Sequence, residues 1–259
     1  MSDEHQVPRR RWPNTPIGAW VLLATALIQA ASPSLAGFDQ GADDDPVVVP
    51  PGPFFAVWGV VVLGCLLVAV CGLKRDRAIA PAFRRLHVPL SITQTGFVLW
   101  LLLAAAVPVL TVPVFGLMLA MLVVALRRAP DVHGTGGGLA KDTVLVESVL
   151  GVYAGWSAAA VWINVASVTS RPPIPLLAAL LAAAVVSEIT LVTAVCRTFP
   201  ARVAAGATGI WALLGVALST FSTGAGALGA LAVAGIGALA VATVATTRRP
   251  PARRRPSTA

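Results

Sequence analysis

The chain is poor in charged residues, which make up 12% of its 259 positions, while 57% are hydrophobic. A soluble domain usually carries about 25% charged and about 45–50% apolar residues. The stretch from Phe54 to Leu73 contains no charge, and as a helix it would measure about 30 Å, the thickness of a bilayer's hydrocarbon core. Similar runs follow to the end of the chain. This shortage of charge argues against an ordinary soluble protein and predicts an all-α, polytopic transmembrane helix bundle.

Residues that hold metals or act as nucleophiles are equally scarce. The three histidines, His5, His87 and His133, fall in the N-terminal tail or in expected loops. No metal or haem site is therefore predicted at membrane depth. The cysteines lack the spacing of metal ligands and are expected to be structural thiols: Cys65, Cys71 and Cys196. The sequence has no G-x-S-x-G nucleophile elbow, and the glycine-rich loop 129–142 lacks the Gly-Lys-Ser/Thr ending of a phosphate loop. We therefore expect neither enzymatic activity nor a cofactor.

Apolar runs and short polar connections divide the chain into eight expected spans. Their predicted bounds are 17–35, 54–73, 88–107, 114–126, 143–168, 174–195, 203–221 and 225–246. The first run also fits a signal peptide, because three arginines precede it and Ser34-Leu35-Ala36 has the small residues of a cleavage site. We favour a retained span, and cleavage would not change the orientation of the spans that follow.

Basic residues are unevenly divided between the two sides of this arrangement. Eighteen of the 19 Lys and Arg residues fall on one side, and the other side receives only Arg171. The positive-inside rule therefore predicts that both termini are cytoplasmic and that the acidic loop 37–53 is outside. The net charge of +8 arises from small clusters between apolar runs, which do not build the basic groove of a nucleic-acid-binding protein.

Aromatic and amide side chains are placed so that several expected spans share an inward face. On the fifth span, Tyr153, Trp156 and Asn164 stand at i, i+3 and i+11, which places them on one side of a helix. That side should point inward, because an amide in lipid needs a hydrogen-bonding partner. Further aromatic residues lie on the second and third spans: Phe55, Trp58 and Trp100. An interfacial aromatic belt explains Trp58 in part but fits Trp156 poorly, since that residue lies near mid-span.

Glu188 is an acidic residue well inside the sixth span, where an ionisable side chain costs about 2.5–3.5 kcal/mol on insertion scales. One interpretation is a proton-coupling or ligand-binding group. The other, which we favour, is a carboxyl that hydrogen-bonds near Ser187 or Thr190 or reaches Arg197, because no second acid or base lies at the same depth.

Two motifs carry a resemblance to a known family. The first is Pro50-x-Gly52-x-x-Phe55-x-x-Trp58-Gly59, and the second is Tyr153-x-x-Trp156 followed by seven residues and Asn164. A weaker match is Trp211-Ala-Leu-Leu-Gly215 in the seventh span. With these motifs the chain resembles the TspO/MBR family, the tryptophan-rich sensory proteins related to the peripheral benzodiazepine receptor, and especially its longer bacterial members. The hydropathy layout agrees over nearly the whole chain.

The resemblance implies a membrane protein of the bacterial inner membrane with a five-helix core at 17–168. Three further helices at 169–246 would follow, with a cytoplasmic tail at 1–16 and a basic cytoplasmic tail at 247–259. It also implies a pocket that opens toward the loop between the first two helices, where relatives bind porphyrins and other flat apolar ligands. The ligand-binding residues that the resemblance implies are Phe55, Trp58, Trp100, Tyr153, Trp156 and Asn164.

The third span departs from the family pattern. Thr93 and Gly96 occupy the places where relatives usually offer an Asn and a Trp ahead of the position of Trp100. Half of the aromatic lining expected from that helix is therefore missing, and the acidic loop 37–53 is a poor match for porphyrin carboxylates. Both departures weaken the case for porphyrin specificity.

Three functions agree with these features. The first is a membrane binding or sensory protein for an apolar or tetrapyrrole-like ligand, with or without its transport. The second is a proton-coupled secondary transporter that uses Glu188, although no broken helix pair or repeated half is evident. The third is an assembly subunit, because small residues recur every four positions on the eighth span: Gly226, Ala230, Ala234, Ala238 and Ala242. Such a stripe would suit a partner helix or a homodimer, and an alanine-rich composition produces it by chance equally well.

Overall fold

The computed structural model describes residues 17–36, 45–74, 77, 81–128 and 140–248. These residues form helices and contain no strand, and eight of the helices are long and apolar enough to cross a membrane. The helices are α1 (Ile17–Ala36), α2 (Val57–Gly72), α4 (Pro81–Ala106), α5 (Thr111–Arg128), α6 (Ala140–Ser167), α7 (Ile174–Thr190), α8 (Phe199–Ser222) and α9 (Gly226–Thr247). Two short 3-10 helices, η1 (Gly52–Ala56) and η2 (Pro108–Leu110), precede α2 and α5, and the π-helix η4 (Leu191–Val195) extends α7. The predicted all-α bundle of eight spans is confirmed. Some of the predictions fall outside the described residues. These concern the tail at 1–16 with His5, His133 in the glycine-rich loop, and residues 249–259.

The largest difference from the predicted bounds is at α4, which begins at Pro81 and includes residues expected to form a basic loop. Its first turns bury Phe83, Leu86 and His87 and expose Arg84 and Arg85. A helix with one charged face and one buried face is not found by a search for uncharged runs. The prediction that His87 lies in a loop is therefore wrong, since its side chain is 6% exposed within α4.

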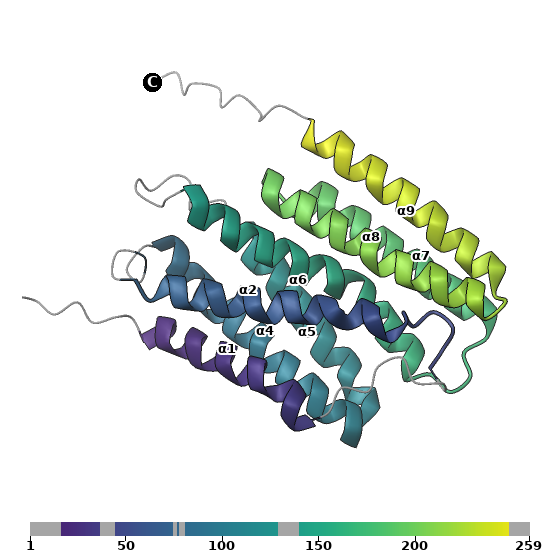
Figure 1. The fold of residues 1–259 in the computed structure, drawn as a ribbon, viewed down its shortest axis with the longest axis horizontal. Coiled ribbons are helices and arrows are strands. Elements are labelled where there is room, and N and C mark those ends of the chain that lie inside the picture. Colours follow the sequence, from purple (N-terminus) through teal and green to yellow (C-terminus); the bar gives the residue numbers. More distant parts are fainter. Residues whose placement is uncertain (1–16, 37–44, 75–76, 78–80, 129–139, 249–259) are drawn as a thin grey trace, which may run out of the picture.

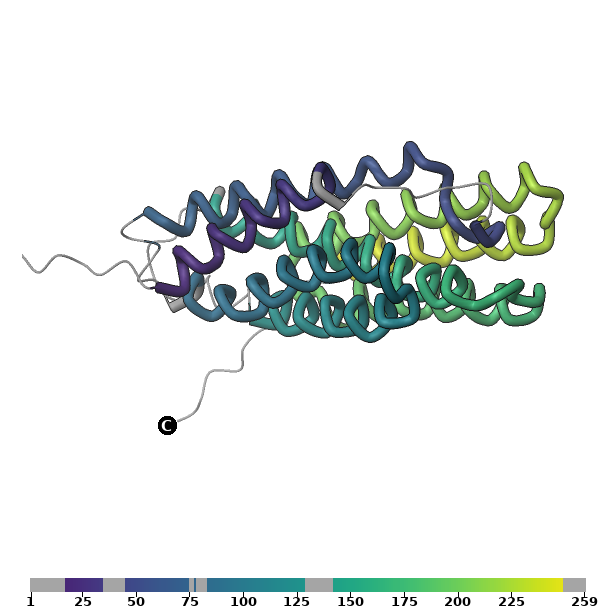
Figure 2. Tube along the Cα trace, turned by 90° about the horizontal axis from the view of Figure 1, so that it is seen from below, coloured from purple at the N-terminus to yellow at the C-terminus, as the bar shows by residue number. Residues whose placement is uncertain are grey.

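Helix α6 occupies the centre of the bundle, where it packs against α2, α5, α7 and α8. Figure 1 shows α1 and α9 at opposite edges of the array. The start of α1 and the end of α9 lie at the same end of the bundle, as an even number of spans requires (Figures 1 and 2). The central position of α6 gives its side chains access to both the N-terminal and the C-terminal helices.

The contact between α6 and α8 is unusually close because it is made by small residues. A Cβ atom added at Gly155 would lie 2.5 Å from the carbonyl oxygen of Ala205, and one at Gly151 would lie 2.6 Å from that of Ala201. Both helices thus present small residues spaced four apart, which permits their backbones to approach closely in lipid. This seam attaches α8 to the helix that carries Trp156 and Asn164.

The outer surface of the bundle is apolar. Large hydrophobic side chains are exposed on every long helix, for example Trp20, Leu63, Val186 and Val241. A surface of this kind is soluble only in a bilayer or a detergent. The small-residue stripe of α9 also faces outward, since Gly226, Ala230, Ala234 and Ala238 are exposed.

Candidate functional site

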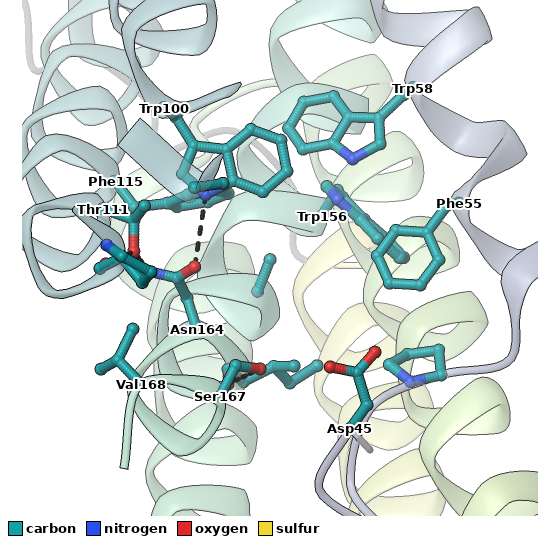
Figure 3. Close-up of a pocket in the computed structure, with 15 residues that line it drawn as sticks. Asp45, Phe55, Trp58, Trp100, Thr111, Phe115, Trp156, Asn164, Ser167 and Val168 are labelled. Atoms are coloured by element: carbon teal, nitrogen blue, oxygen red, sulfur yellow. Dashed lines mark hydrogen bonds between the residues drawn. The ribbon is translucent and has the colours of Figure 1, made fainter. Parts of the chain in front are cut away.

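A cavity of about 240 Å³ lies at the end of the bundle where the segment 45–56 leads into α2. Its walls come from this segment and from α2, α4, α5 and α6 (Figure 3). Five of the six residues implied as ligand-binding by the resemblance line it together: Phe55, Trp58, Trp100, Trp156 and Asn164. The cavity thus brings together side chains that are up to 109 positions apart in the sequence, from Phe55 to Asn164.

Trp58 is the centre of the aromatic wall. Its ring centroid lies 5.7 Å from that of Trp100 and 6.2 Å from that of Trp156, and Phe97 packs on it at 4.7 Å. Phe55 meets Trp156 edge to face at 5.5 Å. Contacts of this geometry are worth about 0.5–1.5 kcal/mol each beyond the area they bury. The rings therefore hold one another in place whether or not the cavity is filled.

Asn164 bridges three helices at the opposite side of the cavity. Its Oδ1 accepts a hydrogen bond of 3.2 Å from Trp100 Nε1, and its Nδ2 donates one of 2.8 Å to Thr111 Oγ1. Thr111 Oγ1 in turn donates to the carbonyl oxygen of Pro108 at the start of η2. The expectation that this amide needs a partner in lipid is met by α4 and α5, and the amide retains one donor and one lone pair.

Two polar groups of the cavity wall have no partner within the described part of the chain. The Nε1 atoms of Trp58 and Trp156 are buried and donate no hydrogen bond. A buried donor without an acceptor costs about 1–3 kcal/mol. Both N–H groups therefore lack an acceptor, and they belong to rings that line the cavity.

The acidic part of the cavity lining was not predicted from the sequence. Asp45 lines the cavity beside Ser167 and Phe55, and its carboxylate is visible below the ring of Phe55 in Figure 3. The acidic loop was recognised, but nothing in its composition distinguished Asp45 from the other acids near it. Phe115 and Thr111 on α5 also line the cavity, and the spacing of apolar residues on that span gives no sign of this role.

Comparison with known proteins gives one family. The family model described as TSPO-like protein matches residues 16–245. This chain belongs to the TSPO-like family. Neither the curated proteins nor the solved structures gave a match to it. The family match runs through α7, α8 and α9 as well as the helices that line the cavity.

Tyr153 is the sixth residue implied by the resemblance, and in this TSPO-like chain it lies behind the cavity. Its ring packs edge to face on Trp58 at 5.8 Å, and its side chain is fully buried. Gln29 Nε2 on α1 donates a 3.3 Å hydrogen bond to the Tyr153 hydroxyl. Tyr153 and Gln29 thus support the ring of Trp58 from the side away from the cavity.

The two positions on α4 that depart from the family pattern both face the protein interior away from the cavity. Thr93 is fully buried and donates a 2.9 Å hydrogen bond to the carbonyl oxygen of Pro89 on its own helix. Gly96 faces α5, where an added Cβ atom would lie 2.6 Å from Met118. Phe97 and Phe115 both pack against Trp58, and of these two Phe115 also lines the cavity.

Glu188 lies on the other side of α6, away from this cavity. Its side chain is fully buried, and a Cβ atom at Gly209 of α8 would lie 2.5 Å from its Oε2. The absence of a side chain at Gly209 therefore makes the space that the carboxyl occupies. The backbone of Ala159 on α6 lies near the carboxyl but does not meet the geometry of a hydrogen bond.

The predicted partners of Glu188 are not found. Neither carboxyl oxygen has a hydrogen-bond partner among the described residues, so the expected bonds near Ser187 or Thr190 or to Arg197 are wrong. Ser187 Oγ instead accepts a 2.8 Å hydrogen bond from Trp162 Nε1. The π-helix η4 begins three residues after Glu188, and such irregular turns frequently occur at functional sites.

Proposed function

We propose that this TSPO-like protein binds a flat, largely apolar ligand in the cavity between α2, α4, α5 and α6, and that it acts without catalysis. The observation that carries the proposal is the convergence of three tryptophans on one cavity, two of them with unpartnered N–H groups. Aromatic faces suit a conjugated ring system, and the two donors suit acceptor atoms on it. A tetrapyrrole or a smaller heteroaromatic compound has both features.

The size and charge of the cavity narrow the ligand. Its volume of about 240 Å³ is below the roughly 300–1,000 Å³ of sites that enclose a drug-sized ligand. A tetrapyrrole would therefore insert part of its ring system unless the wall at 45–56 moves. Asp45 adds an acidic side chain to the lining, so we expect neutral ligands to bind better than carboxylated ones.

Quenching of tryptophan fluorescence by protoporphyrin in detergent tests the proposal. The wild type should show saturable quenching, and Trp156→Ala should weaken the apparent affinity roughly two- to twelvefold, as expected for the loss of one aromatic pair. Trp20→Phe is the matched control, because Trp20 is exposed on α1 at the other end of the bundle. Equal and unsaturable quenching in all three proteins would rule out the cavity as the binding site.

Protoporphyrin dimethyl ester tests the role of the cavity mouth. The ester lacks the two carboxylates and should bind more tightly than the free acid, because Asp45 repels the latter. Asp45→Asn should reduce the difference between the two compounds. If the free acid binds the wild type more tightly than the ester does, the assignment of Asp45 to the mouth of the binding site is wrong.

Proton-coupled transport is a second candidate function, and the buried carboxyl of Glu188 favours it. A carboxyl at this depth without a hydrogen-bond partner must be neutral, hydrated or alternately protonated and deprotonated, and intramembrane acids of this kind mark proton relays. Ligand uptake into vesicles driven by a pH gradient should be abolished in Glu188→Gln. Uptake that is unchanged in this variant would remove Glu188 from the mechanism.

We propose an inner-membrane location with both termini in the cytoplasm. The support is the concentration of Lys and Arg at one end of eight candidate spans, which the positive-inside rule assigns to the cytoplasm. In this orientation the cavity faces the outside of the cell. A thiol introduced near the mouth by Ser167→Cys should react with a membrane-impermeant maleimide added to whole cells, and protection there would reverse the assignment.

A further inference from the structure

The segment 45–56 has two faces, and each contacts a different part of the protein. One face lines the cavity through Asp45, Pro50 and Phe55. The other packs on the C-terminal helices, where Val48, which is 3% exposed, lies near Leu181 of α7 and Leu213 of α8. This segment is therefore a wall shared between the cavity and a helix that does not line it.

Trp211 of α8 makes the most specific of these outer contacts. Its Nε1 donates a 3.0 Å hydrogen bond to the carbonyl oxygen of Phe54, and its ring packs on that of Phe54 at 4.6 Å. The next residue, Phe55, meets Trp156 inside the cavity. Trp211 thus contacts the residue that directly precedes a cavity-lining residue, although Trp211 does not line the cavity itself.

Gly215, one turn along α8 from Trp211, receives the same segment. A Cβ atom there would lie 2.7 Å from Pro50 Cβ and 2.8 Å from the ring of Phe54. The motif Trp211-Ala-Leu-Leu-Gly215 therefore supplies a donor, a ring and a gap in one turn of helix. Together they fit the outer face of the 45–56 wall.

These contacts position the wall from the surface of the bundle. Trp211 is 42% exposed, so its hydrogen bond and ring contact form at the edge of the bundle and not in the core. They can therefore break while the buried contacts of the bundle stay in place. Opening of this wall would widen a cavity that is small for a ligand of the proposed class.

We propose that Trp211 is a latch: by holding Phe54, α8 keeps the 45–56 wall closed and thereby sets the rates of ligand entry and release. This inference rests on the proposed binding function for its purpose, while the closing of the wall itself does not require a ligand. Trp211 is a positioning residue. Because Trp211 holds the wall alike in the free and in the occupied protein, its loss should raise the association and dissociation rates by similar factors and leave the Kd nearly unchanged.

Thiol labelling measures the latch without a ligand. Ala104 of α4 lines the cavity opposite the wall, so a thiol introduced by Ala104→Cys reports access to the cavity. The background carries Cys71→Ser, because Cys65 and Cys196 are already buried. Trp211→Leu should raise the rate of labelling by a small maleimide roughly five- to 150-fold, as expected for the loss of one hydrogen bond and one ring contact.

Further variants separate the latch from a general loss of structure. Trp211→Phe removes the N–H with its five-membered ring but keeps an aromatic ring, so it should give a smaller increase and serves if Trp211→Leu does not fold. Gly215→Ala displaces the wall directly and should also speed labelling. Trp20→Leu, an exposed tryptophan at the far end of α1, should leave the rate unchanged. Equal labelling rates in the wild type and both Trp211 variants would overturn the inference.

Stopped-flow binding of protoporphyrin then tests the consequence for a ligand. A matched rise of both rate constants in Trp211→Leu at constant Kd supports the latch, and unchanged rate constants overturn it. If the wild type does not bind protoporphyrin but labelling is faster in the variants, the latch is supported while the proposed ligand is wrong. The labelling experiment therefore tests the latch and the binding experiment tests the ligand, so that either one can be refuted without the other.

Discussion

Gly155 offers the sharpest test of how this bundle is held together. An alanine at this position would place its Cβ atom 2.5 Å from the carbonyl oxygen of Ala205 and 2.9 Å from its Cα atom. Both are backbone atoms of α8, so no side chain can rotate away and the two helices must separate. Overpacking of this kind usually costs about 1–3 kcal/mol.

Helix propensity acts in the opposite direction and must be subtracted. Alanine is favoured over glycine inside a helix by about 0.8–1.0 kcal/mol in water. Gly116 on α5 and Gly237 on α9 are matched controls, because an added Cβ atom at either would meet nothing within 4 Å. The free energy of unfolding of Gly155→Ala minus that of Gly237→Ala therefore isolates the packing cost and should be roughly −1 to −3 kcal/mol.

Unfolding in mixed micelles, followed by circular dichroism, measures this difference. Trp156 directly follows Gly155, so the shift of α6 should also weaken binding in the adjacent cavity. Gly151→Ala is expected to behave like Gly155→Ala, since it meets the carbonyl oxygen of Ala201. If Gly155→Ala and Gly237→Ala have equal stability, the close contact between α6 and α8 is not what attaches the C-terminal helices.

Three further predictions concern polar groups. Asn164→Leu should lower the free energy of unfolding by about 1–2 kcal/mol, because it removes hydrogen bonds to two helices. Ser167→Ala is the control and should have little effect, since Ser167 Oγ donates only to its own helix. Thermal unfolding compares the two variants. Glu188→Met should raise stability by up to about 3 kcal/mol in the same assay because no hydrogen bond is lost, and a fall would reveal an unseen partner. Asp142→Asn breaks the ion pair with Arg77, whose side chain is 13% exposed, and should cost roughly 1–3 kcal/mol in low salt. An identical stability of Asp142→Asn and the wild type at every salt concentration would contradict that value.

The helices were predictable because each is specified locally. A run without charge that is long enough to cross a bilayer is visible in any window of the sequence, and six of the eight spans agree closely with their predicted bounds. The exceptions are α4, which begins with an amphipathic turn around Phe83, and α8, which begins at Phe199 and includes Arg202 of the expected loop. The η1 helix also forms the first residues of the expected second span. The inward face of α6 was also predictable, because Trp156 and Asn164 stand at helical spacing.

The interfaces between helices were not predictable. The sequence drew attention to the small-residue stripe on α9, which faces outward, while Gly151 and Gly155 on α6 make the close contact with α8. Small residues are frequent in this chain, so their periodicity alone does not identify the pair that meets. In a bilayer, apolar helices gain little by contacting one another instead of lipid, and the shape of both surfaces decides the pairing.

By itself the sequence determined that this protein consists of eight apolar helices, because the cost of a charge or an unpaired backbone group in lipid acts on each segment separately. It also determined one inward face, since an amide and aromatic rings at helical spacing have few alternatives. Only the tertiary structure placed Asp45 at the mouth of the cavity, left Glu188 without its expected partners, and joined Trp211 to Phe54, 157 positions away. Each of these depends on surfaces from distant segments that fit together, and no single segment contains that information.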